Sequence, residues 1–312
     1  MNRIICGVDV SKDDLDCRIV PGEAAGRFAN RPAGIAALAV FCRQHHVELA
    51  VMEATGGYQR QVFLGLCEEG VAAACVNPGA VRHYAKGMGF LEKTDAIDAF
   101  VIASFGQARN LVAMPPPSKK QLRLNSLVKR LRQVTEDMAT NKMRLKQADD
   151  EEMRTSIIEA MAPQKKQSKT LEGEIASLID DDPQWQAIGA ALRSLKGVAD
   201  RTVACILTNL PEIGTYDSRA IAKLTGLAPI ANDSGKKNGP RHIQGGRSTV
   251  RSILYLVADI VRRYDPHIGA FHARLVAKGK PKMVIRIALA HKLLTILNAR
   301  VRDARVKFQI AT

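Results

Sequence analysis

The chain has 312 residues, of which 46% are hydrophobic, and its 46 Lys and Arg residues outnumber 31 Asp and Glu residues to give a formal net charge of +15. This length and apolar content suffice for two compact domains and a connector. No apolar stretch approaches the roughly 18 residues that a membrane-spanning helix needs, and no apolar segment typical of a signal peptide precedes the first predicted strand. We therefore expect a soluble protein with no membrane partner.

The first thirty residues predict the start of a sheet. Residues 4–8 form a short apolar run rich in β-branched side chains, which is typical of a buried strand. Leu15, Cys17 and Ile19 then alternate with polar residues, and Phe28 follows a Pro-Gly turn. This pattern predicts three antiparallel strands.

Helices and strands alternate over the next eighty residues. Pro32 stands where a helix would begin, since proline is tolerated at the first helical position. The apolar face of that helix would consist of Ile35, Leu38, Ala39 and Cys42. The further predicted elements are strands over residues 49–53 and 71–76 and helices around 62–66, near 81 and over 95–105. Together they predict an α/β domain of the ribonuclease-H-like type over residues 1–114.

Four carboxylates in this region indicate a site for a divalent metal. Asp9 follows the first strand in the run GVDVSK, Glu53 ends the strand over residues 49–53, and Asp95 and Asp98 lie three residues apart in KTDAIDA. Neighbouring strands would place Asp9 and Glu53 side by side, and the spacing of three puts the other two on one helical face. Like charges this close are commonly compensated by hard cations with oxygen ligands. The alternative is that each acid is a helix cap, a surface charge or half of an ion pair.

The six cysteines include no Cys-x-x-Cys pair, and most lie within apolar runs. This distribution favours reduced, packed thiols in a cytoplasmic protein over a disulfide framework or a zinc site.

The run Met114-Pro115-Pro116-Pro117 predicts a boundary, because consecutive prolines cannot continue a helix. Beyond it, positions 124, 128, 131, 135, 138, 142 and 145 recur in steps of four and three, which predicts a coiled-coil seam. A second helical stretch, with Leu171, Ile175, Leu178 and Ile179, ends before Pro183. We therefore expect an antiparallel helical arm over residues 115–185 that packs within one chain or pairs two chains.

The positive charge is concentrated at the C-terminal end. Residues 186–312 hold 22 Lys and Arg against 7 Asp and Glu, whereas residues 1–114 hold 11 against 12. Clustered basic residues commonly bind nucleic acid, although a solvated basic surface is the alternative. The segment around Lys196 and Gly197 is similar to a helix-hairpin-helix, whose turn binds phosphate, but it also fits an ordinary helical turn.

Residues 231–242 form a polar, cationic segment that predicts an exposed loop in this mainly α-helical domain. A serine hydroxyl in such a loop needs a base, a metal or cationic surroundings to act as a nucleophile. The candidate phosphate-binding cations of this domain are Lys196, Lys236, Lys237, Arg241, Arg247 and Arg251. The bland reading of Ser234 is a turn serine, and that of Ser248 is a helix N-cap.

The acid motifs resemble those of the DEDD-type transposases of insertion-sequence family one-ten, which includes the Piv-type DNA invertases. The likeness continues through Asn77-Pro78, the run GLAP at residue 226, Ser234-Gly235, and the run GKPK at residue 279. It implies a RuvC-type catalytic domain in which Asp9, Glu53, Asp95 and Asp98 bind Mg²⁺, with two ions per site. It also implies a serine nucleophile, for which Ser234 matches the position and Ser248 is the rival.

The resemblance further implies the partners: DNA of element ends and target, a non-coding guide RNA, and other copies of the chain in a dimer or tetramer. Such a transposase would work in the bacterial cytoplasm, at the nucleoid. Two other functions remain open on the sequence. One is a junction-resolving nuclease that uses water as nucleophile, and the other is a nucleic-acid-binding protein that has lost catalysis.

Overall fold

In a computed structural model, the structure describes residues 3–54, 56–90, 92, 94–235, 239 and 241–311. The chain forms two compact units, Met1–Pro117 and Ser118–Thr312. The boundary coincides with the proline run, whereas the finer division at residue 185 stays a prediction. No helix in the described ranges is long and apolar enough to cross a membrane.

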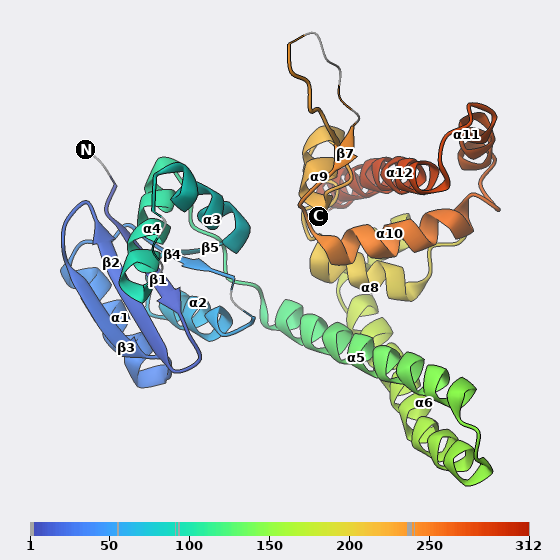
Figure 1. The fold of residues 1–312 in the computed structure, drawn as a ribbon, viewed down its shortest axis with the longest axis horizontal. Helices are drawn as coiled ribbons and strands as arrows, with labels where there is room; N and C mark the ends of the chain where they lie inside the picture. Colours follow the sequence, from blue (N-terminus) through green and yellow to red (C-terminus); the bar gives the residue numbers. More distant parts are fainter. Residues whose placement is uncertain are drawn as a thin grey trace. The chain divides into compact units, whose positions relative to one another are not determined.

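The first unit is built on a five-stranded mixed sheet with the order β3-β2-β1-β4-β5 (Figure 1). The first three strands are antiparallel, while β4 and β5 run parallel to β1. The strands are β1 Ile5–Val10, β2 Asp14–Val20, β3 Ala25–Ala29, β4 Leu49–Glu53 and β5 Ala73–Val76, and the helices are α1 Pro32–Gln44, α2 Gln59–Glu68, α3 Pro78–Gly87 and α4 Asp95–Ala108. This arrangement is compatible with a ribonuclease-H-like domain.

Helices cover both faces of this sheet, and the strands alternate between two cores. On one face α1 and α2 pack against Cys6, Val8 and the other side chains of that core. On the opposite face α3 and α4 pack against Ile5, Val51 and their neighbours. Successive strand residues point to opposite faces, so Gly7, Asp9 and Glu53 lie on the face that α4 covers.

The predicted elements of this unit are confirmed, with shifts at their ends. The helix expected from Pro32 begins there and buries the four predicted apolar residues. The strand expected over residues 49–53 is β4. The strand expected over residues 71–76 begins only at Ala73, because the backbone N–H of Val71 instead bonds the Leu66 carbonyl at the end of α2.

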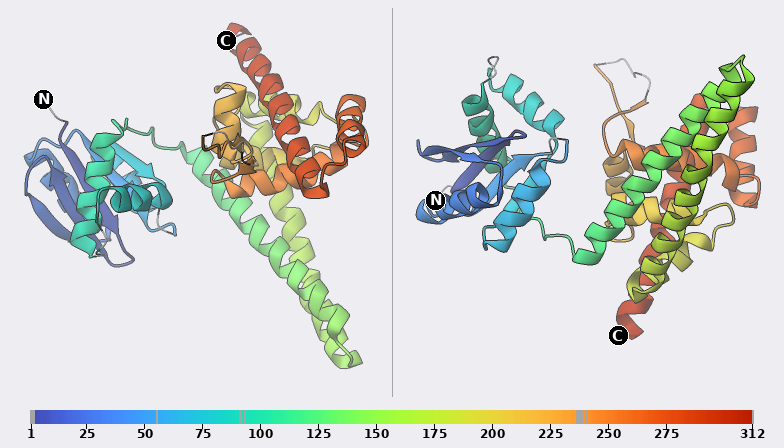
Figure 2. Two further views of the ribbon diagram at one scale, coloured as in Figure 1. Left: turned by 45° about the horizontal axis from the view of Figure 1, so that its top comes forward. Right: turned by 90° about the horizontal axis from the view of Figure 1, so that it is seen from below.

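The second unit is mainly helical, as expected, and shares one apolar core. Its elements are α5 Lys119–Gln147, α6 Glu151–Asp180, α7 Pro183–Arg193, α8 Asp200–Asn209, α9 Ser218–Thr225, β6 Pro229–Ile230, β7 His242–Ile243, α10 Ser248–Val261, α11 Pro266–Ala277 and α12 Lys282–Ala311. Helices α5 and α6 run side by side as an antiparallel hairpin that extends from the rest of the unit (Figure 2).

The seam of α5 differs from the predicted one. The buried positions are Leu124, Leu127, Leu131 and Val134, whereas Lys142 of the predicted seam is exposed. The base of α5 packs on α8 as well as on α6, and this second neighbour turns the apolar face toward Leu127 and Val134. The structure thus shows an intramolecular hairpin, and a coiled coil between chains stays a prediction.

Helix α4 touches the sheet most closely at Gly7. A Cβ atom on Gly7 would overlap the Ala99 carbonyl oxygen and lie 2.5 Å from the Ala103 backbone nitrogen. Further along the helix, Gly106 lies over Ile5 and Val51. Glycine at position 7 is therefore what allows the α4 backbone to rest directly on β1.

We predict that Gly7→Ala destabilises the first unit by about 1–3 kcal/mol or more, because the added methyl group forces α4 away from the sheet. Gly87→Ala is the matched control, since a Cβ there meets nothing within 4 Å. Hydrogen exchange of the β1 amides in the full chain measures the effect. Equal protection of β1 in both variants would contradict the account of this contact.

Candidate active site and serine loop

Carboxylates form a row across the middle of the sheet. Val8 pairs with Met52 in the parallel β1–β4 register, so the next residues, Asp9 and Glu53, are lateral neighbours. Both lie on the α4 face at the carboxyl ends of their strands. Neighbouring strands are about 4.8 Å apart, so the structure brings these two acids together as the sequence predicted.

The first turn of α4 places two more acids above this row. Ala99 and Ala103 lie over Gly7, so Asp95, one turn before Ala99, continues the same stripe toward Asp9. Asp98 stands in the same relation to the buried Ile102. The Thr94 hydroxyl caps the helix by accepting from the Ile97 N–H at 3.3 Å. The positive end of the helix dipole favours acids at these positions.

Sequence reasoning missed a fifth acid, Asp16. It pairs directly with Asp9 in the antiparallel β1–β2 register, and it shares the α4 face because Leu15 and Cys17 point into the opposite core. Burial raises the pKa of Asp16, Arg27 opposes that rise, and the charge of Asp95 adds to it. The alternation of β2 together with its hairpin register to β1 was the signal that could have found it.

This donor set consists of carboxylate oxygens, which are the ligands that hard divalent cations prefer. Among the residues that the structure describes, no three His, Cys, Asp or Glu side chains are close enough together to hold a metal ion. The backbone thus places the acids at one end of the sheet, and their chemistry fits Mg²⁺. Metal binding itself is taken up below as a proposal.

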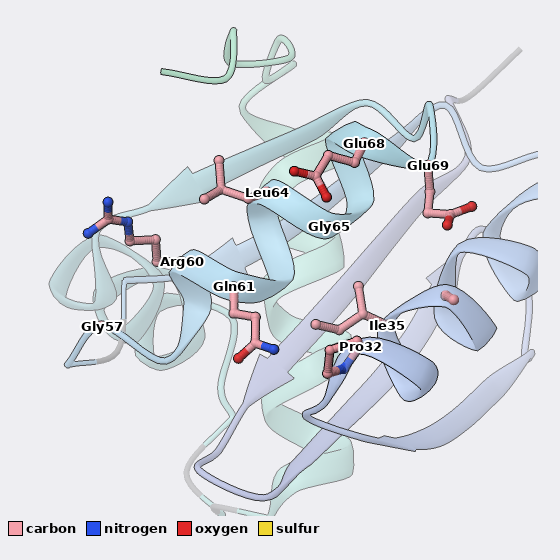
Figure 3. Close-up of a pocket in the computed structure, with 10 residues that line it drawn as sticks. Pro32, Ile35, Gly57, Arg60, Gln61, Leu64, Gly65, Glu68 and Glu69 are labelled. Atoms are coloured by element: carbon pink, nitrogen blue, oxygen red, sulfur yellow. The ribbon is translucent and has the colours of Figure 1, made fainter. Parts of the chain in front are cut away.

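A groove of about 600 Å³ lies elsewhere on this unit, between α1 and α2 (Figure 3). Its walls include Pro32 and Ile35 from α1 and Arg60, Gln61 and Leu64 from α2. These helices cover the opposite face of the sheet from α4, so the groove is separate from the row of carboxylates.

In the second unit, Ser234 lies exposed in the loop between β6 and β7, as predicted. The neighbouring Asp233 carboxylate accepts from the Gly239 N–H at 3.1 Å and from the Arg241 guanidinium at 2.5 Å. The hydrogen bond and charge of Arg241 hold the pKa of Asp233 below its usual range. Asp233 therefore closes the loop that carries the serine. Lys236 and Lys237 lie outside the described residues.

The base of the loop is fixed by two arginines that the sequence assigned to phosphate. Arg247 forms a bidentate pair with Glu212, at 2.5 and 2.6 Å, and also donates to the Asn209 carbonyl at 2.9 Å. Arg251 donates to the Gly245 carbonyl at 2.5 Å. Because these donors are used inside the protein, both residues have structural roles here.

The prediction that Ser248 caps a helix is wrong. Arg247 occupies the N-cap position of α10 with extended backbone angles and without a side-chain cap bond, and Ser248 is the first helical residue.

The turn expected around Gly197 is present between α7 and α8, with Gly197 at φ +105°. Lys196 Nζ lies 4.8 Å from the centroid of the Tyr264 ring. However, Asp200 in the first turn of α8 pairs with Arg193 at 2.6 Å, which places negative charge where a phosphate would bind. The phosphate-binding role of this turn stays a prediction.

Comparison with known families matches both units. A family described as "Transposase" matches residues 6–151, and one described as "Transposase IS116/IS110/IS902 family" matches residues 189–273. The first match contains the row of carboxylates, and the second contains the serine loop. The chain belongs to this IS110-type transposase family, the insertion-sequence family one-ten that the motifs indicated.

Individual relatives agree with this assignment. The chain is 27% identical to the "Pilin gene-inverting protein" of Moraxella lacunata and of Moraxella bovis, over 98% of this chain and 98% of each relative. It is also 27% identical over 47% of its length to "Insertion element IS110 uncharacterized 43.6 kDa protein" of Streptomyces coelicolor, of which the match covers 36%.

We predict that Arg247→Ala destabilises the second unit by about 1–3 kcal/mol, because it leaves the half-buried Glu212 carboxylate without its partner. Burial raises the pKa of Glu212, but the hydrogen bonds and charge of Arg247 outweigh that effect and lower it from the usual 4.5. The ionised pair therefore stabilises the fold above this pH, and that contribution is lost as the pH falls through the lowered pKa.

Urea unfolding of the full chain at neutral and acidic pH measures both effects. Arg263→Ala is the control, because Arg263 makes only an exposed contact of 3.4 Å with Asp259, and we expect a change within about 0.5 kcal/mol. An equal loss in the two variants, or an unchanged acid dependence in Arg247→Ala, would contradict the structural role of this pair.

Proposed function

We propose that the protein is a DNA recombinase that cuts and rejoins strands by phosphoryl transfer with the help of a divalent cation. The observation that supports this most strongly is the position of Asp9 and Glu53 at the carboxyl ends of adjacent strands, beneath the first turn of α4. Membership of a transposase family and relatives named for gene inversion make DNA the expected substrate.

In this proposal Asp9, Glu53, Asp95 and Asp98 hold Mg²⁺, with two ions per site. Bound Mg²⁺ would supply Lewis-acid stabilisation of the charge that develops on the transferred phosphate. The four carboxylates come from two strands and one helix, and the packing at Gly7 fixes the helix against β1. A rigid origin for each oxygen donor limits the conformational freedom that binding would cost.

Ser234 is the proposed nucleophile. Its Oγ attacks phosphorus and forms a phosphoserine ester, while the bond from phosphorus to the departing sugar oxygen breaks and that oxygen gains a proton. The new ester conserves the bond energy, so a strand can be resealed without ATP. Lys236, Lys237 and Arg241 supply positive charge around the transferred phosphate.

The proposed partners follow from the charge distribution and the family. The basic residues 186–312 bind DNA, and a non-coding guide RNA selects the element ends and the target. Because the acids and the serine belong to different compact units, a dimer or tetramer that combines units from two chains would complete each site. RNA that copurifies with the protein and maps to its own element would support the guide.

We predict that Asp9→Asn and Glu53→Gln lower Mg²⁺-dependent DNA cleavage by more than the roughly 10- to 100-fold typical of losing a residue that only supports a metal ligand. Removing one charge eases repulsion, so thermal stability without metal should hold or rise. Glu69→Gln is the control, since Glu69 makes an exposed contact with Arg43. Cleavage at the wild-type rate in either site variant would refute the metal site.

We predict that a DNA substrate with a nick near the cleavage point traps the protein covalently, because the released fragment diffuses away before it can reverse the ester. Ser234→Ala should abolish this adduct and retain DNA binding, whereas Ser248→Ala should leave it intact. Mass spectrometry of the trapped peptide identifies the linked residue. A nucleotide on Ser248 would move the assignment, and cleavage without any adduct would favour water as the nucleophile.

A further inference from the structure

Asp16 occupies the same level of the sheet as the proposed metal ligands. It lies directly opposite Asp9 on β2, and Glu53 follows on the other side of Asp9. Directly opposite residues of an antiparallel pair have Cβ atoms about 4.5–5.5 Å apart. Three carboxylates therefore stand on three consecutive strands of one sheet face, beneath the acids of α4.

The surroundings of Asp16 separate it from an ordinary surface acid. Its side chain is 20% exposed, against 39% for Asp14 on the same strand. The charge of Asp95 acts on Asp16 and helps to raise its pKa, which places the first turn of α4 near β2, whereas no acid of α4 contributes to the pKa shift of Asp14. An acid in this position adds repulsion to the site unless a cation compensates it.

Arg27 on β3 partly provides that compensation. Its guanidinium lies 2.8 Å from the Asp14 carboxylate and 3.8 Å from that of Asp16. The shorter contact is a hydrogen bond, and the longer one is only an ion pair. The Asp16 carboxylate can therefore turn toward a cation while Arg27 remains bound to Asp14.

We propose that Asp16 is a further metal-binding carboxylate of this site, beside Asp9. The inference rests on the proposed function, because it assigns one more oxygen donor to the same divalent cation. Arg27 holds the Asp16 carboxylate at the edge of the site until a cation takes its place. Asp14 fixes Arg27 through their hydrogen bond and does not itself contact the ion.

Mn²⁺ binding to the full chain tests this inference without relying on catalysis. The signal of free Mn²⁺ in electron paramagnetic resonance gives the affinity of the protein for the ion. We expect Asp16→Asn to weaken binding about 10- to 100-fold, as for loss of residues that tune a metal site. Asp14→Asn removes the hydrogen bond to Arg27 on the same strand but leaves the carboxylate row intact, so binding should stay within about twofold, inside ordinary context variation.

Each outcome decides between distinct accounts. Unchanged Mn²⁺ binding in Asp16→Asn, with loss in Asp9→Asn, would overturn this inference and leave the proposed function standing. An equal loss in Asp14→Asn would show that Arg27 placement, not the Asp16 oxygen, matters. No Mn²⁺ binding by the wild-type chain would overturn the proposed function as well.

A second variant keeps the question measurable if Asp16→Asn does not fold, as judged by circular dichroism. Arg27→Gln removes the cation that competes for Asp16, so Mn²⁺ should bind more tightly than to the wild type. Unchanged or weaker binding in Arg27→Gln would overturn the inference.

Discussion

The contact between helix α4 and strand β1 at Gly7 sets the geometry of the first unit. Because position 7 has no side chain, the backbone of Ala99 and Ala103 rests directly on the strand. One turn of helix and two residues of strand cover nearly the same distance. The first turn of α4 is therefore delivered to the level of Asp9, and every proposed role of the carboxylates depends on that placement.

The second unit solves a different problem, which is how to present a polar loop from a helical core. Its loop is closed at the tip by Asp233 and at the base by the pair of Arg247 and Glu212. These internal bonds use cations that the net charge alone would assign to nucleic acid. The excess of positive charge remains large, so a basic segment can fix its own loop and still attract a polyanion.

Local patterns explain what the sequence could predict. Short apolar runs ending in Asp9 and Glu53, and a proline at the start of α1, are signals contained within a few residues. Asp16 was missed because its alternation was used only to find the buried side of the strand. The seam of α5 and the role of Arg247 depend on distant partners, α8 and Glu212, which no local periodicity reveals.

Crystals of the full chain soaked with Mn²⁺ would test the central claim most directly, through the anomalous scattering of the bound ion. The account predicts anomalous density within about 2.0–2.3 Å of carboxylate oxygens from Asp9 and Glu53, at the range expected for small divalent cations on oxygen. The first turn of α4 should close the other side of that density. Ordered Mn²⁺ bound elsewhere, with none at these two carboxylates, would contradict the account.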